Sequence, residues 1–308
     1  MADIDRTDAA GLLQDQNINE ILQNAAEQSA ALRTFRTVRM GTKIAKVPIM
    51  TVLPQASWVS GDTGRKATSE QKWEKKTLTA EELAVIVPIP ENVFDDSEFG
   101  VWEEVRPRIA EAVGKAVDAA VFFGFNAPAS FDDDLVTGAT AAGQVVSQGD
   151  GVDLADDINL VWGEVEAAGH DVDVQYAGRR IRARLRGLRD DNNAPIYLES
   201  LRGDGNDRSL MGEQITFVSN GAWDYGQAAL IAGDRSAAII GVRSDVTYKI
   251  LTEATLTDGA GNVTFSLAEQ DMIALRAKFR MGFVVADTVT SETGEQEYPF
   301  AVLEGPMS

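Results

Sequence analysis

The residue types that carry most enzymatic and metal chemistry are scarce in this chain of 308 residues. It contains no cysteine and one histidine, His170, which excludes disulfides, thiolate nucleophiles and multi-histidine metal sites. His170 lies in GHDVDV beside Asp171 and Asp173, where an ordinary polar loop is preferred over a cation site. No GxxxxGK phosphate loop, dinucleotide fingerprint or GxSxG nucleophile motif is present. The sequence therefore predicts no cofactor and no metal.

Carboxylates remain as candidates for catalysis, because the chain has 48 acidic residues and a formal net charge of −20. A pair of carboxylates, as in glycoside hydrolases, is compatible with that composition. However, Asp132, Asp133 and Asp134 are consecutive, so their side chains must point in different directions. The cluster from Asp150 to Asp157 lacks the spacing of a calcium-binding EF-hand loop. Solvated acidic loops are the preferred interpretation, and an enzyme is not expected.

Charge is segregated along the chain. Residues 125–178 contain eleven acidic residues and no Lys or Arg, whereas 179–189 (RRIRARLRGLR) contain six arginines and no acid. Such blocks suit contacts between complementary patches, within one chain or between copies. The apolar residues of the arginine block fall on one helical face, at Ile181, Leu185 and Leu188. This pattern favours a helix that packs on a core with a basic outer face over a DNA-recognition helix.

A basic, tryptophan-bearing stretch, RKATSEQKWEKK (65–76), stands out in this acidic chain. It follows a polar segment that contains glycine and shows no helical period, which predicts a long hairpin or extended loop. An isolated two-stranded hairpin is marginal in water, so this one needs a surface from elsewhere. Pro48, Pro54 and the prolines of LAVIVPIP (83–90) restrict the neighbouring strands to sheet edges or strand ends.

Helical periodicity predicts the elements that position these segments. An N-terminal helix over 18–32 has an apolar face and is too short to be stable alone. A long helix over 98–123, with a kink or break expected at Pro107, forms the backbone of the fold. A third helix covers 154–168, and TDGAGN predicts a turn between later β-prone segments. Without a regular strand–helix–strand alternation, the fold class is α+β. No apolar run is long enough to cross a membrane.

Eight segments, in this order, resemble the major capsid protein family of tailed bacteriophages, whose coat fold is shared with herpesvirus shells and encapsulins. They include PIMTVLPQASWVSGD, RIAEAVGKAVDAAVFFG, LMGEQITFVSN and DMIALRAKFRMGFVVAD. The resemblance extends from about residue 18 to about residue 303. It implies a structural protein that self-assembles, as pentamers and hexamers, into the icosahedral shell around phage double-stranded DNA.

The resemblance also implies a division of the chain. The segments are an N-terminal arm (1–47), an E-loop with flanking strands (48–90), a P-domain spine helix (91–125), an A-domain (126–244), a P-domain return (245–290) and a C-terminal strand and tail (291–308). The arm residues expected to contact other copies are Ile18, Ile21 and Leu22. The corresponding E-loop residues are Trp58, Arg65, Lys66, Lys72, Trp73, Lys75 and Lys76.

The partners and location follow from the same resemblance. A separate scaffolding protein is expected, because only about 47 residues precede the PIMTVLP motif. A portal is expected as well, and the resemblance leaves room for a decoration protein. DNA is expected inside the shell without tight binding, because the protein is strongly acidic. The location is the virion capsid, assembled in the host cytoplasm, with no membrane partner.

Some relatives weld their subunits through a Lys–Asn isopeptide bond that a Glu assists. The matching positions hold Asp271 and Lys278 in this chain, so no such bond is expected. Two alternatives to the phage shell remain: an encapsulin-type compartment of the same fold around a cargo enzyme, and, less favoured, an acidic hydrolase with a carboxylate pair. Electron microscopy of the purified protein separates these three functions.

Overall fold

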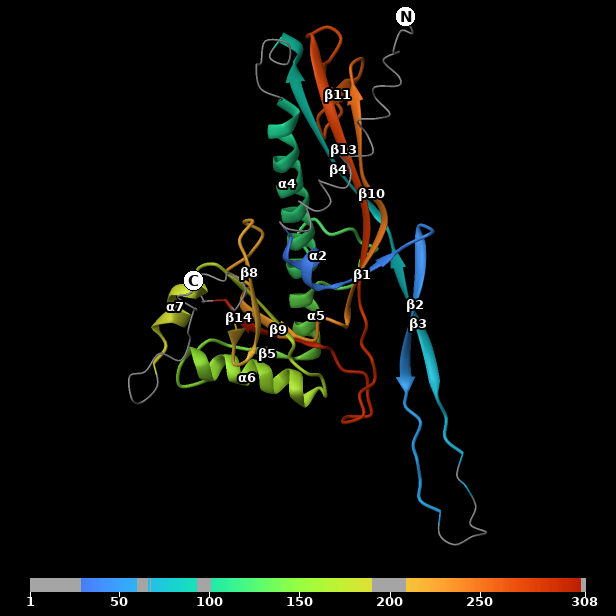
Figure 1. Ribbon diagram of the computed structural model, residues 1–308, viewed down its shortest axis with the longest axis vertical. Coiled ribbons are helices and arrows are strands. Elements are labelled where there is room, and N and C mark those ends of the chain that lie inside the picture. The colour runs from blue at the N-terminus through green and yellow to red at the C-terminus, as the bar shows by residue number, and fades with distance from the viewer. Residues whose placement is uncertain (1–28, 60–65, 67, 93–100, 190–208, 306–308) are drawn as a thin grey trace, which may run out of the picture.

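The computed structural model describes residues 29–59, 66, 68–92, 101–189 and 209–305. These residues form a mixed fold with one four-stranded sheet, one six-stranded sheet and two two-stranded hairpins. A long helix, α4 (Val101–Phe123), lies along the four-stranded sheet and reaches the six-stranded sheet (Figure 1). This arrangement confirms the predicted α+β class. In the described ranges, no helix has both the length and the apolar character needed to cross a membrane.

The four-stranded sheet has the order β1-β10-β13-β4. Its strands are β1 (Arg36–Arg39), β10 (Ala238–Leu251), β13 (Met272–Val285) and β4 (Glu81–Pro90). β1 is parallel to β10, and the other pairs are antiparallel. The edge position predicted for LAVIVPIP is confirmed, because β4 is the last strand of the sheet. Within the span DMIALRAKFRMGFVVAD, residues Met272–Val285 form β13.

The spine helix α4 packs on one face of this sheet. Its most buried residues include Ile109, Val113, Val117 and Val121, which share one core with alternate residues of β13. The short helix α2 (Ala30–Thr34) packs against α4 as well. Because two elements cover α4, its buried face is wider than a single stripe. The helix continues through Pro107, so the expected break does not occur, and a kink at Pro107 stays a prediction.

The six-stranded sheet has the order β5-β14-β9-β6-β8-β7. Its strands are β5 (Val145–Val146), β14 (Phe300–Glu304), β9 (Ala228–Gly233), β6 (Val174–Gly178), β8 (Glu213–Val218) and β7 (Ser209–Leu210). Three helices, α5 (Leu135–Ala142), α6 (Leu154–Ala167) and α7 (Ile181–Gly187), accompany it. α6 begins at Asp153, whose carboxylate accepts the backbone N–H groups of Ala155 and Asp156. This N-cap explains the predicted helix start.

Each sheet combines strands from different segments of the division that was expected from the sequence. β10 begins at Ala238, inside the range 126–244, yet it pairs with β13 in the four-stranded sheet. β14, from the range 291–308, lies between β5 and β9 in the six-stranded sheet. Residues 29–39, from the arm range, form α2 and β1 within the body. The body of the protein therefore starts well before residue 47.

Two hairpins extend from the sheets. One consists of β2 (Ile44–Val52) and β3 (Lys72–Thr79), which pair with each other in antiparallel fashion. The other consists of β11 (Thr255–Thr257) and β12 (Val263–Ser266). In the turn of the second hairpin, the Asp258 carboxylate accepts the backbone N–H groups of Ala260 and Asn262. The turn predicted at TDGAGN is therefore confirmed.

Candidate assembly surface

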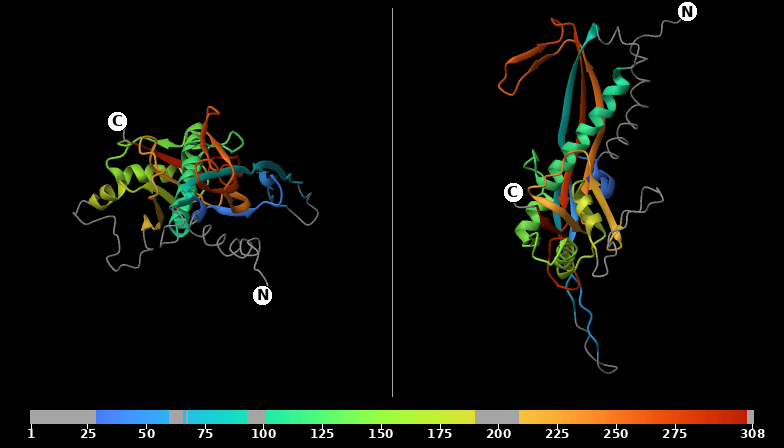
Figure 2. Two further views of the ribbon diagram at one scale, coloured as in Figure 1. Left: turned by 90° about the horizontal axis from the view of Figure 1, so that it is seen from above. Right: turned by 90° about the vertical axis from the view of Figure 1, so that its left-hand side faces the viewer.

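The hairpin β2–β3, with the residues that join its strands, lies in the range that the sequence analysis assigns to the E-loop, and we keep that name for it. Figures 1 and 2 show that it projects far beyond the body of the protein. Its root packs on the four-stranded sheet through a buried cluster that includes Ile49, Leu78, Ile239 and Val284. A Cβ atom at Gly282 would lie 2.4 Å from the carbonyl oxygen of Thr79, so glycine permits this close approach. The root is thus fixed, whereas the described residues farther out, 54–59 and 68–71, are exposed.

The far part of the E-loop exposes large apolar side chains. Trp58 is fully exposed, with a relative accessibility of 104%, and Trp73 is 56% exposed. Burying one such indole removes roughly 150–250 Å² from water, worth about 4–6 kcal/mol before the loop is ordered. Lys72 and Glu70 form an ion pair 3.5 Å long, but both side chains are exposed, so the pair contributes little. This composition suits a surface that another molecule covers.

Lys76 differs from the other E-loop cations because its charge is satisfied inside the chain. Its Nζ atom donates to Asp132 Oδ2 at 3.0 Å, to Asp287 Oδ2 at 2.7 Å and to the carbonyl oxygen of Val285 at 2.8 Å. These bonds use all three ammonium protons. Burial lowers the pKa of Lys76, but the hydrogen bonds and charges of the two carboxylates outweigh it and raise the pKa above its ordinary value. Lys76 therefore fastens the E-loop root to the body.

The predicted E-loop contact residues thus fall into separate groups. Lys66, Lys72 and Lys75 are exposed, as the prediction requires. Arg65 lies outside the described residues, and so do the predicted arm contacts at Ile18, Ile21 and Leu22. Lys76 belongs to the root and not to the exposed end. Lys76 was expected to contact another copy, but Asp132 and Asp287 of its own chain already bind its ammonium group.

A second anchor fixes the start of the described chain. The Asp118 carboxylate, on α4, is fully buried and accepts four hydrogen bonds, from Ser29 Oγ, Ala30 N, Ala31 N and Asn220 Nδ2, at 2.6–3.0 Å. Burial raises the pKa of Asp118, whereas these four donors favour the ionised form. One side chain thereby joins α2, the spine helix and the segment after β8. Asp118 was not identified as an anchor from the sequence, although an acidic residue among apolar helix residues (KAVDAAVFF) could have indicated it.

Phe35 extends this anchor into the core. Its ring contacts the rings of Phe122, Tyr176, Phe283 and Phe300, with centroid separations between 5.4 and 6.4 Å. These partners come from α4, β6, β13 and β14, so Phe35 packs where the two sheets and the helix meet. The first described residues, 29–35, are therefore part of the core.

The arginine helix α7 matches its predicted pattern. Ile181, Leu185 and Leu188 are buried, as the helical spacing predicts. Among the arginines of the block, the guanidinium of Arg180 stacks over Tyr225 at 4.5 Å and that of Arg182 over Phe217 at 5.2 Å. These stacking contacts hold the basic face against the protein's own aromatic residues.

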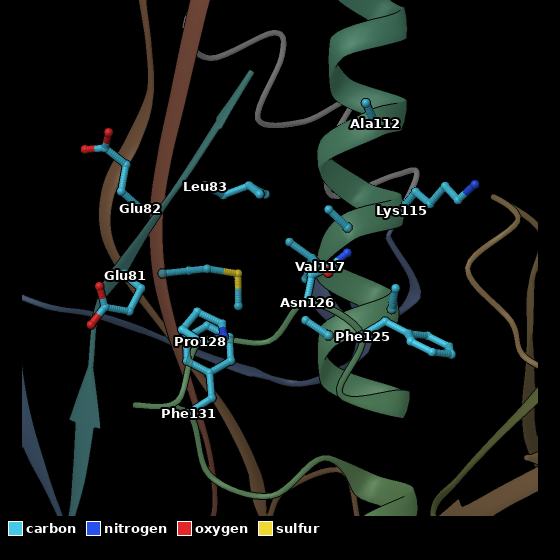
Figure 3. A pocket seen from close by; sticks show the side chains of 14 residues that line it. Glu81, Glu82, Leu83, Ala112, Lys115, Val117, Phe125, Asn126, Pro128 and Phe131 are labelled. Atoms are coloured by element: carbon cyan, nitrogen blue, oxygen red, sulfur yellow. The ribbon is translucent and has the colours of Figure 1, made fainter. Parts of the chain in front are cut away.

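The structure offers no catalytic arrangement at its cavity. A cavity of about 450 Å³ lies between α4, β4 and the segment after α4 (Figure 3). Its two carboxylates have other partners: Glu82 pairs with Lys278, and Glu81 accepts Ser130 Oγ at 3.0 Å. Most other lining residues are apolar, including Leu83, Phe131 and Met281. No group of His, Asp or Glu in the described residues is arranged to hold a metal ion.

The exposed hairpin and its fixed root suit a protein that is built for contacts with other molecules. The model of the phage capsid family matches residues 9–289, and the chain belongs to this family. It is 27% identical over 285 residues to the major capsid protein of Staphylococcus phage 80alpha, covering 90% of this chain and 82% of that protein.

Solved structures give the same result. A chain from Microbacterium phage Oxtober96 is 46% identical, with a TM-score of 0.78 over 99% of this chain and 100% of that one. A chain from Mycobacterium phage Cain is 36% identical, with a TM-score of 0.79 over all of both chains. The resemblance predicted from the sequence is confirmed. The chain is a structural protein of a tailed-phage capsid shell and not an enzyme.

Proposed function

We propose that the exposed end of the E-loop covers a neighbouring copy and so joins subunits into pentamers and hexamers of an icosahedral shell. The observation that carries this proposal is a fully exposed Trp58 at the end of a hairpin whose root is fixed. A fixed root limits the directions in which the hairpin projects, so less freedom is lost on binding. Arg65, Lys66, Lys72, Trp73 and Lys75 complete the contact.

The N-terminal arm supplies a second contact in this proposal. Ile18, Ile21 and Leu22 share one face of a helix in the predicted pattern, and a short helix with such a face needs a partner. The buried clasp at Asp118 holds the chain where the arm joins the body. Because the arm is held at one end, it can reach a neighbouring copy while residues 29–39 stay packed in the body of their own subunit.

The remaining partners belong to the same proposal. A separate scaffolding protein guides assembly in the host cytoplasm, a portal occupies one vertex, and a decoration protein has room outside. Double-stranded DNA fills the shell. With a net charge of −20 per chain, the wall repels phosphate and lets the genome slide in.

The E-loop contact is tested by removing its apolar and basic groups without touching the root. Trp58→Ser with Lys72→Glu and Lys75→Glu should abolish shells, as seen by sedimentation and electron microscopy. The unassembled subunit should keep its melting temperature, because these side chains are exposed. Arg108→Glu with Lys115→Glu, two exposed positions on α4, reverses the same charge elsewhere and serves as control. Normal shells from the E-loop variant would refute the proposal.

A further inference from the structure

The face of the four-stranded sheet opposite α4 is divided into two halves. Near Gly241 and Gly282 it is covered by the E-loop root, where Leu78 packs on both glycines. Figure 1 shows α4 beside the sheet and the hairpin β2–β3 at the lower end of the sheet. Farther along, the same face carries Thr247, Lys249 and Ile86, all of which are exposed. The described elements therefore leave this half of the face open.

Strand register places a row of cations on the open half. Arg276, Lys278 and Arg280 alternate along β13, each half-buried, with buried residues between them that face α4. Lys249 of β10 stands directly opposite Arg276, because the two are register partners. Side chains of partnered residues share one face of a sheet. We call Lys249, Arg276, Lys278 and Arg280 the basic stripe.

The basic stripe has more cations than the described residues neutralise. One carboxylate in the described chain, that of Glu82, forms an ion pair with the stripe, through Lys278. The hydrogen bond from Lys278 and the charges of Lys278, Arg280 and Arg276 lower the pKa of Glu82. The Nε atoms of Arg276 and Arg280 are shielded from solvent and lack a hydrogen-bond partner among the described residues. The described residues therefore leave part of the stripe's positive charge unpaired, and an acidic segment would complement it.

Charge decides between the two extended segments of this chain as the source of that acceptor. Residues 1–28 carry six acidic residues and one arginine, whereas residues 54–76 of the E-loop carry five basic and three acidic residues. A basic stripe attracts the first segment and repels the second. The exposed Ile86 and Ala84, on the same face, also offer apolar surface to the arm.

The point where the arm leaves the body favours a neighbouring copy as its source. Ser29 is bound to Asp118 on α4, so the arm starts on the side of the sheet opposite the stripe. Twenty-eight extended residues span at most about 90–100 Å, enough to reach an adjacent subunit. We propose that the acidic arm, residues 1–28, of a neighbouring copy binds the basic stripe. This inference rests on the proposed function, because it needs subunits held side by side.

Cross-linking in assembled shells tests the contact directly. Shells are assembled from a mixture of ¹⁵N-labelled and unlabelled full-length chains and treated with a carbodiimide, which joins a carboxylate to a lysine amine with loss of water. Mass spectrometry should find Lys249 or Lys278 joined to an acidic residue between Asp3 and Glu27, in pairs of mixed isotope. Links from the stripe to Glu70 or Glu74 of the E-loop, or arm links of a single isotope only, would overturn the proposal.

A charge exchange gives an independent readout. Lys249→Glu with Arg276→Glu should lower the yield of shells by about tenfold, and Asp3, Asp5 and Asp8→Lys should do the same. Combining both sets should restore the yield, whereas the arm set combined with Arg108→Glu should not. No recovery in the combined variant, with subunit melting unchanged, would contradict the proposal. If the wild-type chain forms no shells, the proposed function fails; shells without the arm contact refute this inference alone.

Discussion

At the scale of single residues, two charged side chains hold together segments that lie far apart in the chain. Lys76 bonds to Asp132 and Asp287, 56 and 211 residues away. Asp118 bonds to Ser29 and Asn220, 89 and 102 residues away. Local sequence does not reveal such partners. The sequence therefore placed Lys76 among the exposed lysines and did not single out Asp118.

Replacing Lys76 by Met should destabilise the subunit by about 1–3 kcal/mol, because it leaves two carboxylates together without their cation. The folded pKa of Lys76 is raised, so its contribution is fully present below its ordinary pKa of 10.5 and is lost as pH rises through the folded pKa. Unfolding in urea between pH 7 and 11 measures both effects. The variant should lose less stability than the wild type over the alkaline part of that range.

Lys75→Met provides the matched control for this substitution. Lys75 is the adjacent lysine of β3, and its side chain is exposed. Its replacement should change stability by less than about 0.5 kcal/mol. Equal losses for the two variants would show that the bonds of Lys76 to Asp132 and Asp287 contribute nothing specific.

Asp118→Ala should have a larger effect, about 3–5 kcal/mol, because four donors lose their acceptor in a buried site. Asp118→Asn keeps one acceptor oxygen and should fall between Ala and the wild type. Thermal unfolding gives the order of the three proteins. Limited proteolysis near residues 29–35 should accelerate in the same order, and unchanged protection in the Ala variant would contradict the anchoring role.

At the scale of elements, local sequence patterns predicted the helices, strands and turns well. They did not predict which elements pack against one another. The helix over 154–168, the edge strand LAVIVPIP and the turn at TDGAGN are all found, because the signals for them are local. The wider buried face of α4 was not predicted, since helical periodicity does not count how many neighbours cover a helix. Residues 29–39 were assigned to the arm because their aromatic partners are distant in sequence.

This difference changes where a truncation should be made. Deleting residues 1–28 should leave the melting temperature of the subunit unchanged while preventing normal shells. Deleting residues 1–40 should instead unfold it, because Phe35, Ala31 and Met40 are buried and β1 is removed from its sheet. Circular dichroism and electron microscopy of both truncations separate the two effects. Normal shells from the shorter deletion would rule out the arm as an assembly element.

At the scale of the whole molecule, the residues at positions 271 and 278 predict a shell that is held without isopeptide bonds. Asp271, where some relatives have an amide, is a carboxylate and a poor electrophile at neutral pH. Lys278, where those relatives have a proton acceptor, is already paired with Glu82. The two positions therefore lack the groups that an isopeptide bond requires.

Particles boiled in detergent should consequently release single chains. A denaturing gel should show one band near the chain mass of 33.2 kDa. Noncovalent contacts do not survive denaturation, whereas isopeptide bonds do. A ladder of multimers would show that other residues, and not Asp271 and Lys278, perform the cross-linking.

The aromatic contact between Phe35 and Phe300 also governs when the protein can fold during synthesis. At about 5–20 residues per second, a ribosome needs roughly 13–50 s to add residues 36–300 after Phe35. β14 lies inside the six-stranded sheet, so that sheet cannot close until the end of translation either. A nascent chain on a polysome therefore lacks a finished core to present to its neighbours. We therefore expect the complete subunit, and not the nascent chain, to enter the growing shell.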